Sequence, residues 1–299
     1  MTIETISWPS SYGDEAKPRK GFFTDTSLCI GCKACEVACK EWNRIPMSNQ
    51  GFTGNSYDNT IDLGADTWRH VAFIEQRVPA GVQDGASLVQ AAQRGEAMDA
   101  GVQTYQEGPG EGIRWLMASD VCKHCTHAAC LEVCPTGALF RTEFGTVVVQ
   151  EDVCNGCGYC VSACHFGVLD QREQDGRVWK CTLCYDRLKD DMEPACAHAC
   201  PTDSIQFGDL SQLREHAEHR LARLQDAGQH DAQLYLADDD DGIEGAGAFF
   251  LLLDDPEVYG LPPDPVDPVH DLGEIWTAAA AAAVALGAGL AAAVFGGRK

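Results

Sequence analysis

All sixteen cysteines of this 299-residue chain fall into four groups of four, and this grouping constrains the fold more than any other feature. The groups are Cys29, Cys32, Cys35 and Cys39; Cys122, Cys125, Cys130 and Cys134; Cys154, Cys157, Cys160 and Cys164; and Cys181, Cys184, Cys196 and Cys200. The first and third groups have the spacing C-x2-C-x2-C-x3-C, which is typical of the run that holds cubane iron–sulfur clusters in bacterial ferredoxins. The sixteen thiols therefore predict four [4Fe–4S] clusters.

The spacing also predicts how the groups combine. The first three cysteines of such a run can wrap one cluster, whereas the fourth ligates the other cluster of a two-cluster ferredoxin. We therefore expect an α+β fold with two ferredoxin-like two-cluster modules. Gly31, Gly156 and Gly158 lie inside the runs, where the absence of a Cβ lets the backbone approach a cluster. The second and fourth groups both end in C-x3-C-P, at Pro135 and Pro201, which indicates an internal repeat.

Zinc is the main alternative ligand. Zinc sites use two C-x2-C pairs for each ion, and the second and fourth groups would be compatible with that pattern if they stood alone. The first and third groups are too dense for it. Disulfides belong to small secreted domains and do not fit the repeated two-residue spacing. The C-x-x-C-H motif of c-type haem is absent from the sequence. A zinc-binding scaffold therefore stays as the less favoured interpretation.

The charge balance limits the partners that the chain can bind. The formal net charge is −23, which argues against nucleic acid and against an anionic membrane surface. Much of the acidic excess lies in the last third of the chain, including the run at 238–241, which we interpret as a solvated loop. Residues 1–20 carry charges and lack the apolar core of a signal peptide.

The C-terminal segment 275–295 holds twenty-one residues without a charge. As a helix it would extend about 30 Å, the thickness of a bilayer core, so we predict a single transmembrane helix. Trp276 is a candidate interface anchor. Arg298 and Lys299 would place the C-terminus in the cytoplasm and residues 1–274 outside. A buried or interface helix within a complex is the alternative.

The chain divides by composition into three parts. We expect a four-cluster ferredoxin-like domain over 1–208 with an insertion over 46–121, then a helix, a strand and a proline-rich spacer over 209–274, then the membrane helix. The insertion's middle, 79–112, lacks a clear period and predicts a loop or short helix that covers a partner surface. Hydrophobic patterns predict strands at 71–74, 113–117 and 249–253, hairpins at 140–150 and 171–179, and an amphipathic helix at 209–224.

These residues resemble the beta, iron–sulfur, subunit of membrane-bound formate dehydrogenases of the N and O type. The resemblance covers nearly the whole chain and depends on the order of the cysteine groups and on the residues around them. These are Cys29-Ile-Gly-Cys-Lys-Ala-Cys followed by Glu41-Trp42-Asn43, Trp179-Lys180-Cys181-Thr-Leu-Cys184, Glu193-Pro-Ala-Cys196, and Tyr259-Gly-Leu-Pro before the terminal helix.

The resemblance implies a nested set of cluster ligands. Cluster 1 would take Cys29, Cys32, Cys35 and Cys200; cluster 2, Cys39, Cys181, Cys184 and Cys196; cluster 3, Cys122, Cys125, Cys130 and Cys164; and cluster 4, Cys134, Cys154, Cys157 and Cys160. It also implies no catalytic site in this chain. A molybdopterin alpha subunit would oxidise formate, a haem b gamma subunit would receive the electrons and reduce quinone, and the chain would be exported with its signal-bearing partner. The iron–sulfur subunit of a sulfur-compound or nitrate reductase is the alternative.

Two departures from the family pattern bear on the predicted sites. His165 stands where the third group would usually have a proline, which either alters the backbone near Cys164 or is a tolerated surface change. The insertion is also longer than in the family. In addition, Lys33, Lys40, Lys123 and Lys180 lie beside predicted ligands. These lysines are either solvated surface residues or cations that favour the reduced form of a cluster.

Overall fold

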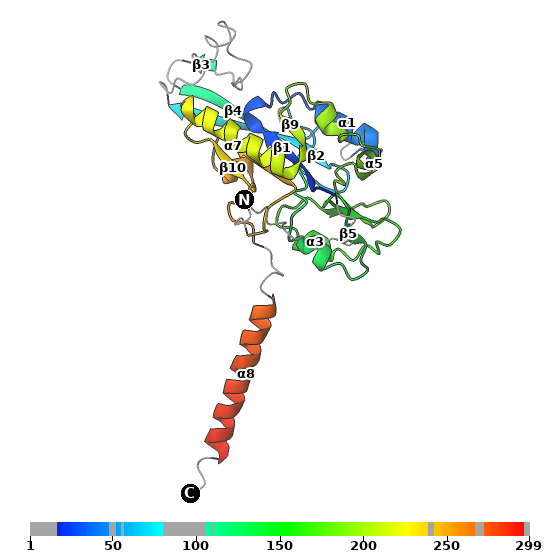
Figure 1. Cartoon of the computed structure of the whole chain (residues 1–299), viewed down its shortest axis with the longest axis vertical. Helices are drawn as coiled ribbons and strands as arrows, with labels where there is room; N and C mark the ends of the chain where they lie inside the picture. The colour runs from blue at the N-terminus through cyan, green and yellow to red at the C-terminus, as the bar shows by residue number, and fades with distance from the viewer. Residues whose placement is uncertain are drawn as a thin grey trace.

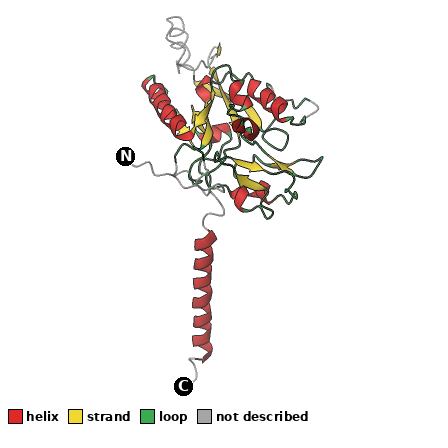
Figure 2. Cartoon of the chain, turned by 45° about the vertical axis from the view of Figure 1, so that its right-hand side comes forward, coloured by secondary structure: helices red, strands yellow, loops and turns green. Residues whose placement is uncertain are grey.

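The computed structural model describes residues 17–47, 52–54, 57–79, 106–108, 111–238, 242–266 and 272–295. Small sheets and short helices form the body of the molecule, and one long helix stands apart from it (Figures 1 and 2). The largest of its sheets contains four strands, in the order β10-β11-β1-β9. These are β1 (Lys20–Asp25), β9 (Ile205–Asp209), β10 (Gln233–Tyr235) and β11 (Ala248–Leu252).

The four-stranded sheet joins the two ends of the body. β1 runs parallel to β11 and antiparallel to β9, so its residues contact strands that follow it by about two hundred positions. All five residues of β11 are buried, because both faces of the sheet are covered. One face packs against the helix α7 (Leu210–Asp226) through Phe23 and Phe249, and the other face contributes Phe22 to a second core that contains the cysteines.

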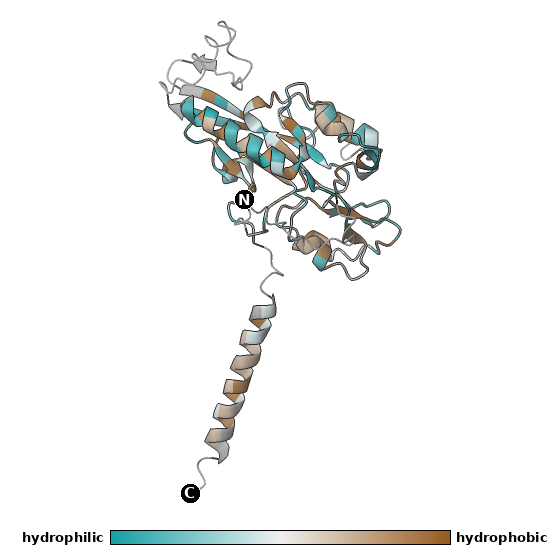
Figure 3. Ribbon diagram, viewed as in Figure 1, coloured by the Kyte–Doolittle hydropathy of each residue, from teal (hydrophilic) through white to brown (hydrophobic). Residues whose placement is uncertain are grey.

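The amphipathic helix and the buried strand are confirmed. α7 buries Leu210, Leu213, Ala217 and Leu224, which follow one another at intervals of three, four and seven residues, as the hydrophobic pattern predicts. Figure 3 shows mainly hydrophilic colours along the side of α7 that is visible there. The helix ends before Gly228, which has a φ of +95°. The predicted boundary at 208 stays a prediction, and strands from both sides of it pair in one sheet.

The two ends of the insertion form a second antiparallel sheet. Its strands are β2 (Arg69–Pro79), β3 (Gln106–Gly108) and β4 (Glu111–Val121), in the order β2-β4-β3. The register runs from Arg69 opposite Val121 to Pro79 opposite Glu111. The strands predicted at 71–74 and 113–117 are therefore confirmed and are longer than expected. Most of the loop or short helix predicted over 79–112 lies outside the described residues.

Helices, most of them short, and the loops beside them carry the cysteines. The helices are α1 (Ala34–Asn43), α3 (Ala129–Glu132), α4 (Tyr159–Ala163), α5 (Tyr185–Lys189) and α6 (Ala195–His198). Two hairpins lie between them: β5 (Leu139–Arg141) with β6 (Val147–Val149), and β7 (Asp170–Gln171) with β8 (Val178–Trp179). Both predicted hairpins are thus confirmed, and each turn contains a glycine of positive φ, Gly145 and Gly176.

The predicted transmembrane helix is not supported. Segment 275–295 does form most of a helix, α8 (Leu272–Phe295), but among the residues that the structure describes no helix is long and apolar enough to cross a membrane. Alanine is the strongest helix former, so an alanine-rich run becomes helical by propensity alone. Its single methyl group contributes far less apolar surface than a leucine side chain, so freedom from charge was an insufficient criterion. The single-pass topology and its orientation depended on this span and lose their support with it.

Candidate metal centres

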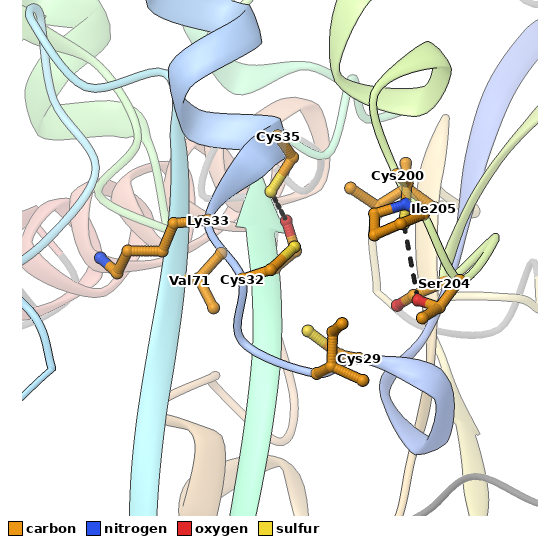
Figure 4. A pocket seen from close by; sticks show the side chains of 12 residues that line it. Cys29, Cys32, Lys33, Cys35, Val71, Cys200, Ser204 and Ile205 are labelled. Carbon is orange, nitrogen blue, oxygen red and sulfur yellow. Dashed lines mark hydrogen bonds between the residues drawn. The ribbon is translucent and has the colours of Figure 1, made fainter.

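Figure 4 shows a hollow lined by cysteines from two distant segments. Cys29, Cys32 and Cys35 come from the loop before α1 and from its first turn, and Cys200 follows α6. The hollow encloses about 290 Å³ of space, part of which is open to solvent. Burial raises the pKa of Cys29, and the charges of Cys200 and Cys32 also raise it. We call these four residues the first thiol set.

A second thiol set lies between α1 and α6. Burial raises the pKa of Cys39 well above its ordinary value, and the neighbouring charges of Cys181, Cys196 and Cys184 raise it further. The Asn43 amide lies 3.7 Å from the sulfur of Cys39 and 3.8 Å from the sulfur of Cys184, and it can donate a hydrogen bond to each. One side chain of α1 thus holds two thiols that come from distant parts of the sequence.

The third thiol set contains the buried Cys122 and three partly buried thiols. Burial raises the pKa of Cys125, followed by the charges of Cys122, Cys130 and Cys164. The pKa of Cys130 rises to about 12, mainly through burial. Arg141, itself buried, donates hydrogen bonds to the carbonyl oxygens of Cys125 at 2.9 Å and Thr126 at 2.7 Å. These bonds fix the loop that carries the set.

The fourth thiol set comprises Cys134, Cys154, Cys157 and Cys160. Burial raises the pKa of Cys160 to about 11, and the charges of the other three raise it as well. Burial alone would also raise the pKa of Cys134, but hydrogen bonds from the backbone of residues 136, 138 and 139 and from a threonine hydroxyl lower it overall. Backbone N–H groups that point at a sulfur are the donors that iron–sulfur sites use to tune the cluster.

The four sets form a series in space. Besides burial, the charge of Cys196 in the second set raises the pKa of Cys35 in the first. Besides burial, the charge of Cys122 in the third set raises the pKa of Cys181 in the second. In the same way, the charge of Cys160 in the fourth set raises the pKa of Cys130 in the third. Each set therefore neighbours the next one. Which four thiols share a cluster stays a prediction, implied by the family resemblance.

The chemistry of these sets suits iron–sulfur clusters. Gly156, with a φ of +71°, approaches the hairpin turn so closely that a Cβ would lie 2.1 Å from the carbonyl oxygen of Gly176. The loop can take this path only without a side chain. Within the described residues, no three histidine, cysteine or acidic side chains converge on a point that one metal ion could occupy. A cluster of four irons is larger than one ion and needs its thiolates further apart.

Two of the lysines beside the ligands are buried. Lys123 and Lys180 are 0% and 1% exposed, so the interpretation as solvated surface residues is wrong for these two. Burial lowers the pKa of Lys180, but the charges of Cys122, Cys130 and Cys181 more than compensate, and the net pKa lies above its ordinary value. Lys33 and Lys40 remain partly exposed.

Sequence reasoning missed one polar neighbour of the thiols, Arg69. Arg69 is 1% exposed and donates to the sulfur of Cys196 at 3.4 Å and to the carbonyl of Ser119 at 3.1 Å. It belongs to the insertion, where no motif marks it.

His165, the departure from the family pattern, is partly buried and meets Phe166 edge to face at 5.8 Å.

Comparison with known proteins supports the same interpretation. Two family models described as 4Fe-4S dicluster domains match residues 28–138 and 113–210. The nitrate-inducible formate dehydrogenase iron–sulfur subunit of Escherichia coli is 37% identical over 289 residues, covering 94% of this chain and 86% of that protein. The formate dehydrogenase iron–sulfur subunit of Haemophilus influenzae is 38% identical, covering 81% of this chain and 68% of that protein.

A relative from another enzyme complex is more distant. One component of the anaerobic dimethyl sulfoxide reductase of Escherichia coli is 32% identical over 195 residues, covering 65% of this chain and 76% of that protein. The sixteen cysteines and the two dicluster matches together fit four [4Fe–4S] clusters. The ferredoxin-like part of the predicted fold class is therefore supported.

Proposed function

The chain belongs to the family of formate dehydrogenase iron–sulfur subunits, and we propose that it carries electrons away from a molybdopterin subunit that oxidises formate. Four [4Fe–4S] clusters are the carriers. We assign the first thiol set to cluster 1, the second to cluster 2, the third to cluster 3 and the fourth to cluster 4. The substrate chemistry takes place in the partner, so this chain needs no catalytic site of its own.

The series of thiol sets is the observation that carries the proposal. Thiols of successive sets lie close enough for the charge of one to raise the pKa of the other. The pairs are Cys35 with Cys196, Cys181 with Cys122, and Cys130 with Cys160. Carriers that each have the next one as a neighbour suit the transfer of electrons from one carrier to another. A chain that only stored iron, or that used metal as a structural support, would gain nothing from such a series. When bound, each cluster would take up and release one electron at a time.

The protein's own groups prepare the sites for this role. Burial raises the pKa of Cys35 to about 11 and that of Cys130 to about 12, so cluster binding must displace the protons of these two thiols. Buried cations and N–H donors near the sulfurs then offset the negative charge of the thiolates. Asn43, Arg69 and Lys180 are the side chains placed to do this.

The first set, through Cys32, is a candidate contact for the electron-donating partner. Cys32 is exposed, and the apolar side chains Ile30 and Val37 beside it are 53% and 60% exposed. The proposal extends to a haem b subunit that receives the electrons, which has its support in the family alone. The iron–sulfur subunit of a sulfur-compound reductase is the second candidate, favoured by the 32% identity to the component of dimethyl sulfoxide reductase.

EPR spectroscopy of the purified complex, with and without formate, tests the proposal. Reduced-cluster signals that appear when formate is added would support both the carriers and the formate-oxidising partner. If dithionite produces the signals and formate does not, the proposal that the chain transfers electrons through its clusters stands, and the assignment of formate as the substrate of the partner is excluded. Metal analysis should give about sixteen irons per chain. Zinc in place of iron would favour the scaffold alternative.

A further inference from the structure

Lys180 is a cation buried between carbonyl groups and thiols. Its side chain is 1% exposed. Its Nζ donates to the carbonyl oxygens of Val147 and of Cys181, the latter at 2.9 Å, and to the sulfur of Cys122 at 3.4 Å. In the described part of the chain these partners are two carbonyls and a thiol. An ammonium group taken out of water needs negative charge nearby, and two carbonyl dipoles supply only part of it.

The position of Lys180 between two thiol sets indicates where the negative charge that its ammonium group needs would come from. Cys122 belongs to the third thiol set and Cys181 to the second, and the structure brings these two sets together at this lysine. The second and third sets are also where the two dicluster modules meet. Cluster-bound thiolates on either side of Nζ would provide the negative charge that the carbonyls lack.

A fixed positive charge in this position has a definite electrochemical effect. Reduction adds one negative charge to a cluster, and a nearby cation favours the reduced form. The effect is largest where water is excluded, because the effective dielectric constant is lower there. It also falls off with distance, so it acts on the two adjacent clusters more than on the outer two.

We propose that Lys180 is a charged residue at the junction of the two modules that raises the reduction potentials of clusters 2 and 3 together. This inference depends on the proposed function, because it concerns the same electron path. With both potentials raised by one group, neither cluster becomes a barrier to transfer between the modules. Lys180 acts on the clusters through space and through the Cys122 sulfur, and takes no part in substrate chemistry.

Lys123 provides the contrast that isolates the effect. It is equally buried, at 0% exposed, and it follows Cys122 directly in the sequence. However, its Nζ forms an ion pair with the carboxylate of Asp120. The pair is neutral overall, so it contributes little net charge to the neighbouring clusters.

Redox titration of the whole complex, followed by EPR, tests the proposal. The variants are Lys180→Gln, which keeps a donor without the charge, and Lys180→Met, which removes both. The control is the double variant Lys123→Met with Asp120→Asn, which removes a buried pair without changing the net charge. Mediators and dithionite set the potential, so the titration is independent of formate. Iron content is measured in each preparation.

We expect both Lys180 variants to retain iron, with two of the four midpoint potentials lowered. At a fixed applied potential the ratio of reduced to oxidised cluster should fall about tenfold for those two, which equals about 59 mV for a one-electron couple. The control should shift each ratio less than twofold. Unchanged potentials, or an equal shift in all four clusters, would overturn the proposal. Loss of iron from both variants would show a purely structural lysine and would overturn it too.

Failure of the proposed function gives a different result. If formate reduces no cluster in the wild-type complex while the titration still shows two potentials that depend on Lys180, the electron donor is wrong and the role of the lysine stands. If formate reduces all clusters and the potentials do not depend on Lys180, the function stands and this inference fails.

Discussion

Asp58 shows how a single carboxylate can hold the loop that carries the first thiol set. Its Oδ1 accepts a hydrogen bond from Lys33 at 2.8 Å and from the Thr60 hydroxyl at 2.7 Å. Burial alone would raise the pKa of Asp58, but these bonds lower it to about 2. Lys33 directly follows Cys32, a member of the set. Asp58 therefore links the insertion to the first set.

We expect Asp58→Asn to lower the free energy of unfolding by about 1–2 kcal/mol, because one pKa unit corresponds to about 1.4 kcal/mol and the pair is partly solvated. A depressed pKa stabilises the folded state above the unfolded pKa of about 4, and the contribution is lost as the pH falls from about 4 to about 2. The deficit in thermal midpoint, about 2–6 °C, should thus be the same at pH 8 and pH 5.

The control for this prediction is the exposed Asp62, for which Asp62→Asn should leave the thermal midpoint unchanged. A deficit for Asp58→Asn that is present at pH 8 and absent at pH 5 would contradict the low pKa. An equal deficit in the Asp62 variant would show that the loop as a whole, rather than the Asp58 contacts, determines the stability.

Gly156 carries the second prediction for a single residue. In Gly156→Ala the new Cβ would meet the carbonyl oxygen of Gly176 at 2.1 Å, so the loop of the fourth thiol set must move. We expect the variant to lose the iron of one cluster, about four atoms of sixteen. Gly176→Ala is the matched control, since its φ of +69° is similar and nothing lies within 4 Å of its Cβ. Iron analysis of both variants makes the comparison.

The control should lose only the stability associated with a left-handed alanine, about 1 kcal/mol, and should keep its iron. Equal iron contents in the two variants would mean that the backbone contact at Gly156 does not shape the site.

The residues in and around the thiol sets differ in how far the sequence alone could identify them. The thiols, and glycines such as Gly156, stand in a spacing that favours iron–sulfur ligation over zinc, so the sequence could single them out. Arg69 could not be assigned in this way, because its role depends on burial and on neighbours from distant segments and a single sequence contains no local signal for it. The sequence did place Lys180 beside a predicted ligand, but it could not distinguish a solvated lysine from a buried cation.

The helix α7 is attached to the cluster-bearing part of the chain by one buried ion pair. Arg220 of α7 lies 2.8 Å from Asp25 at the end of β1, and their side chains are 4% and 0% exposed. Asp25 also accepts a hydrogen bond from the backbone of Ser27 at 2.9 Å, two residues before the first cysteine. The pair therefore positions the strand end from which the first thiol set starts.

Arg220→Met should lower the free energy of unfolding by about 3–5 kcal/mol, because it leaves a buried carboxylate without its partner. Arg223→Met, at an exposed position one turn further along α7, is the control and should change stability by less than about 0.5 kcal/mol. Thermal denaturation measures both. The double variant with Asp25→Asn should recover part of the loss. Similar effects at positions 220 and 223 would rule out a special role for the pair.

Helices and strands long enough to repeat their hydrophobic pattern could be predicted from the sequence. Helices of about one turn could not. α7 and β11 show the helix and strand periods over enough residues to be recognised. The cysteine-bearing helices α3 and α6 contain four residues each, which is barely one turn, so no period can develop in them. The strand order was also beyond reach, because β1 pairs with β11 across more than half of the chain.

In the whole molecule, α8 shows the limit of reasoning from composition. Its residues have no charge between 275 and 295, yet the described residues contain no helix apolar enough for a membrane. The side chains of Ile275, Val284 and Leu290 are 58%, 72% and 65% exposed. The prediction relied on the length of the segment and its lack of charge, and these two properties were not sufficient.

The body of the molecule contains two hydrophobic cores that should respond differently to the loss of iron. One core holds Phe23, Leu213 and residues 249–252 of β11. The other includes Cys35, Cys181 and their neighbours, and around it lie α1, four helices of four or five residues and two-stranded hairpins. Helices this short are unstable alone, and an isolated hairpin is marginal. The second core must therefore obtain much of its order from the clusters that join its segments.

Anaerobic removal of iron with a chelator should consequently unfold the two cores to different extents. We expect amide hydrogen exchange to accelerate strongly over 122–200, where α3 to α6 and the two hairpins lie, and to stay slow over α7 and β11. Mass spectrometry of peptides from the iron-loaded and iron-free protein provides the comparison. If α7 and β11 lose protection together with the cysteine-bearing segments, the two cores form one cooperative unit. If no segment loses protection, the thiol sets are preorganised, and the packed side chains alone hold the electron path in place.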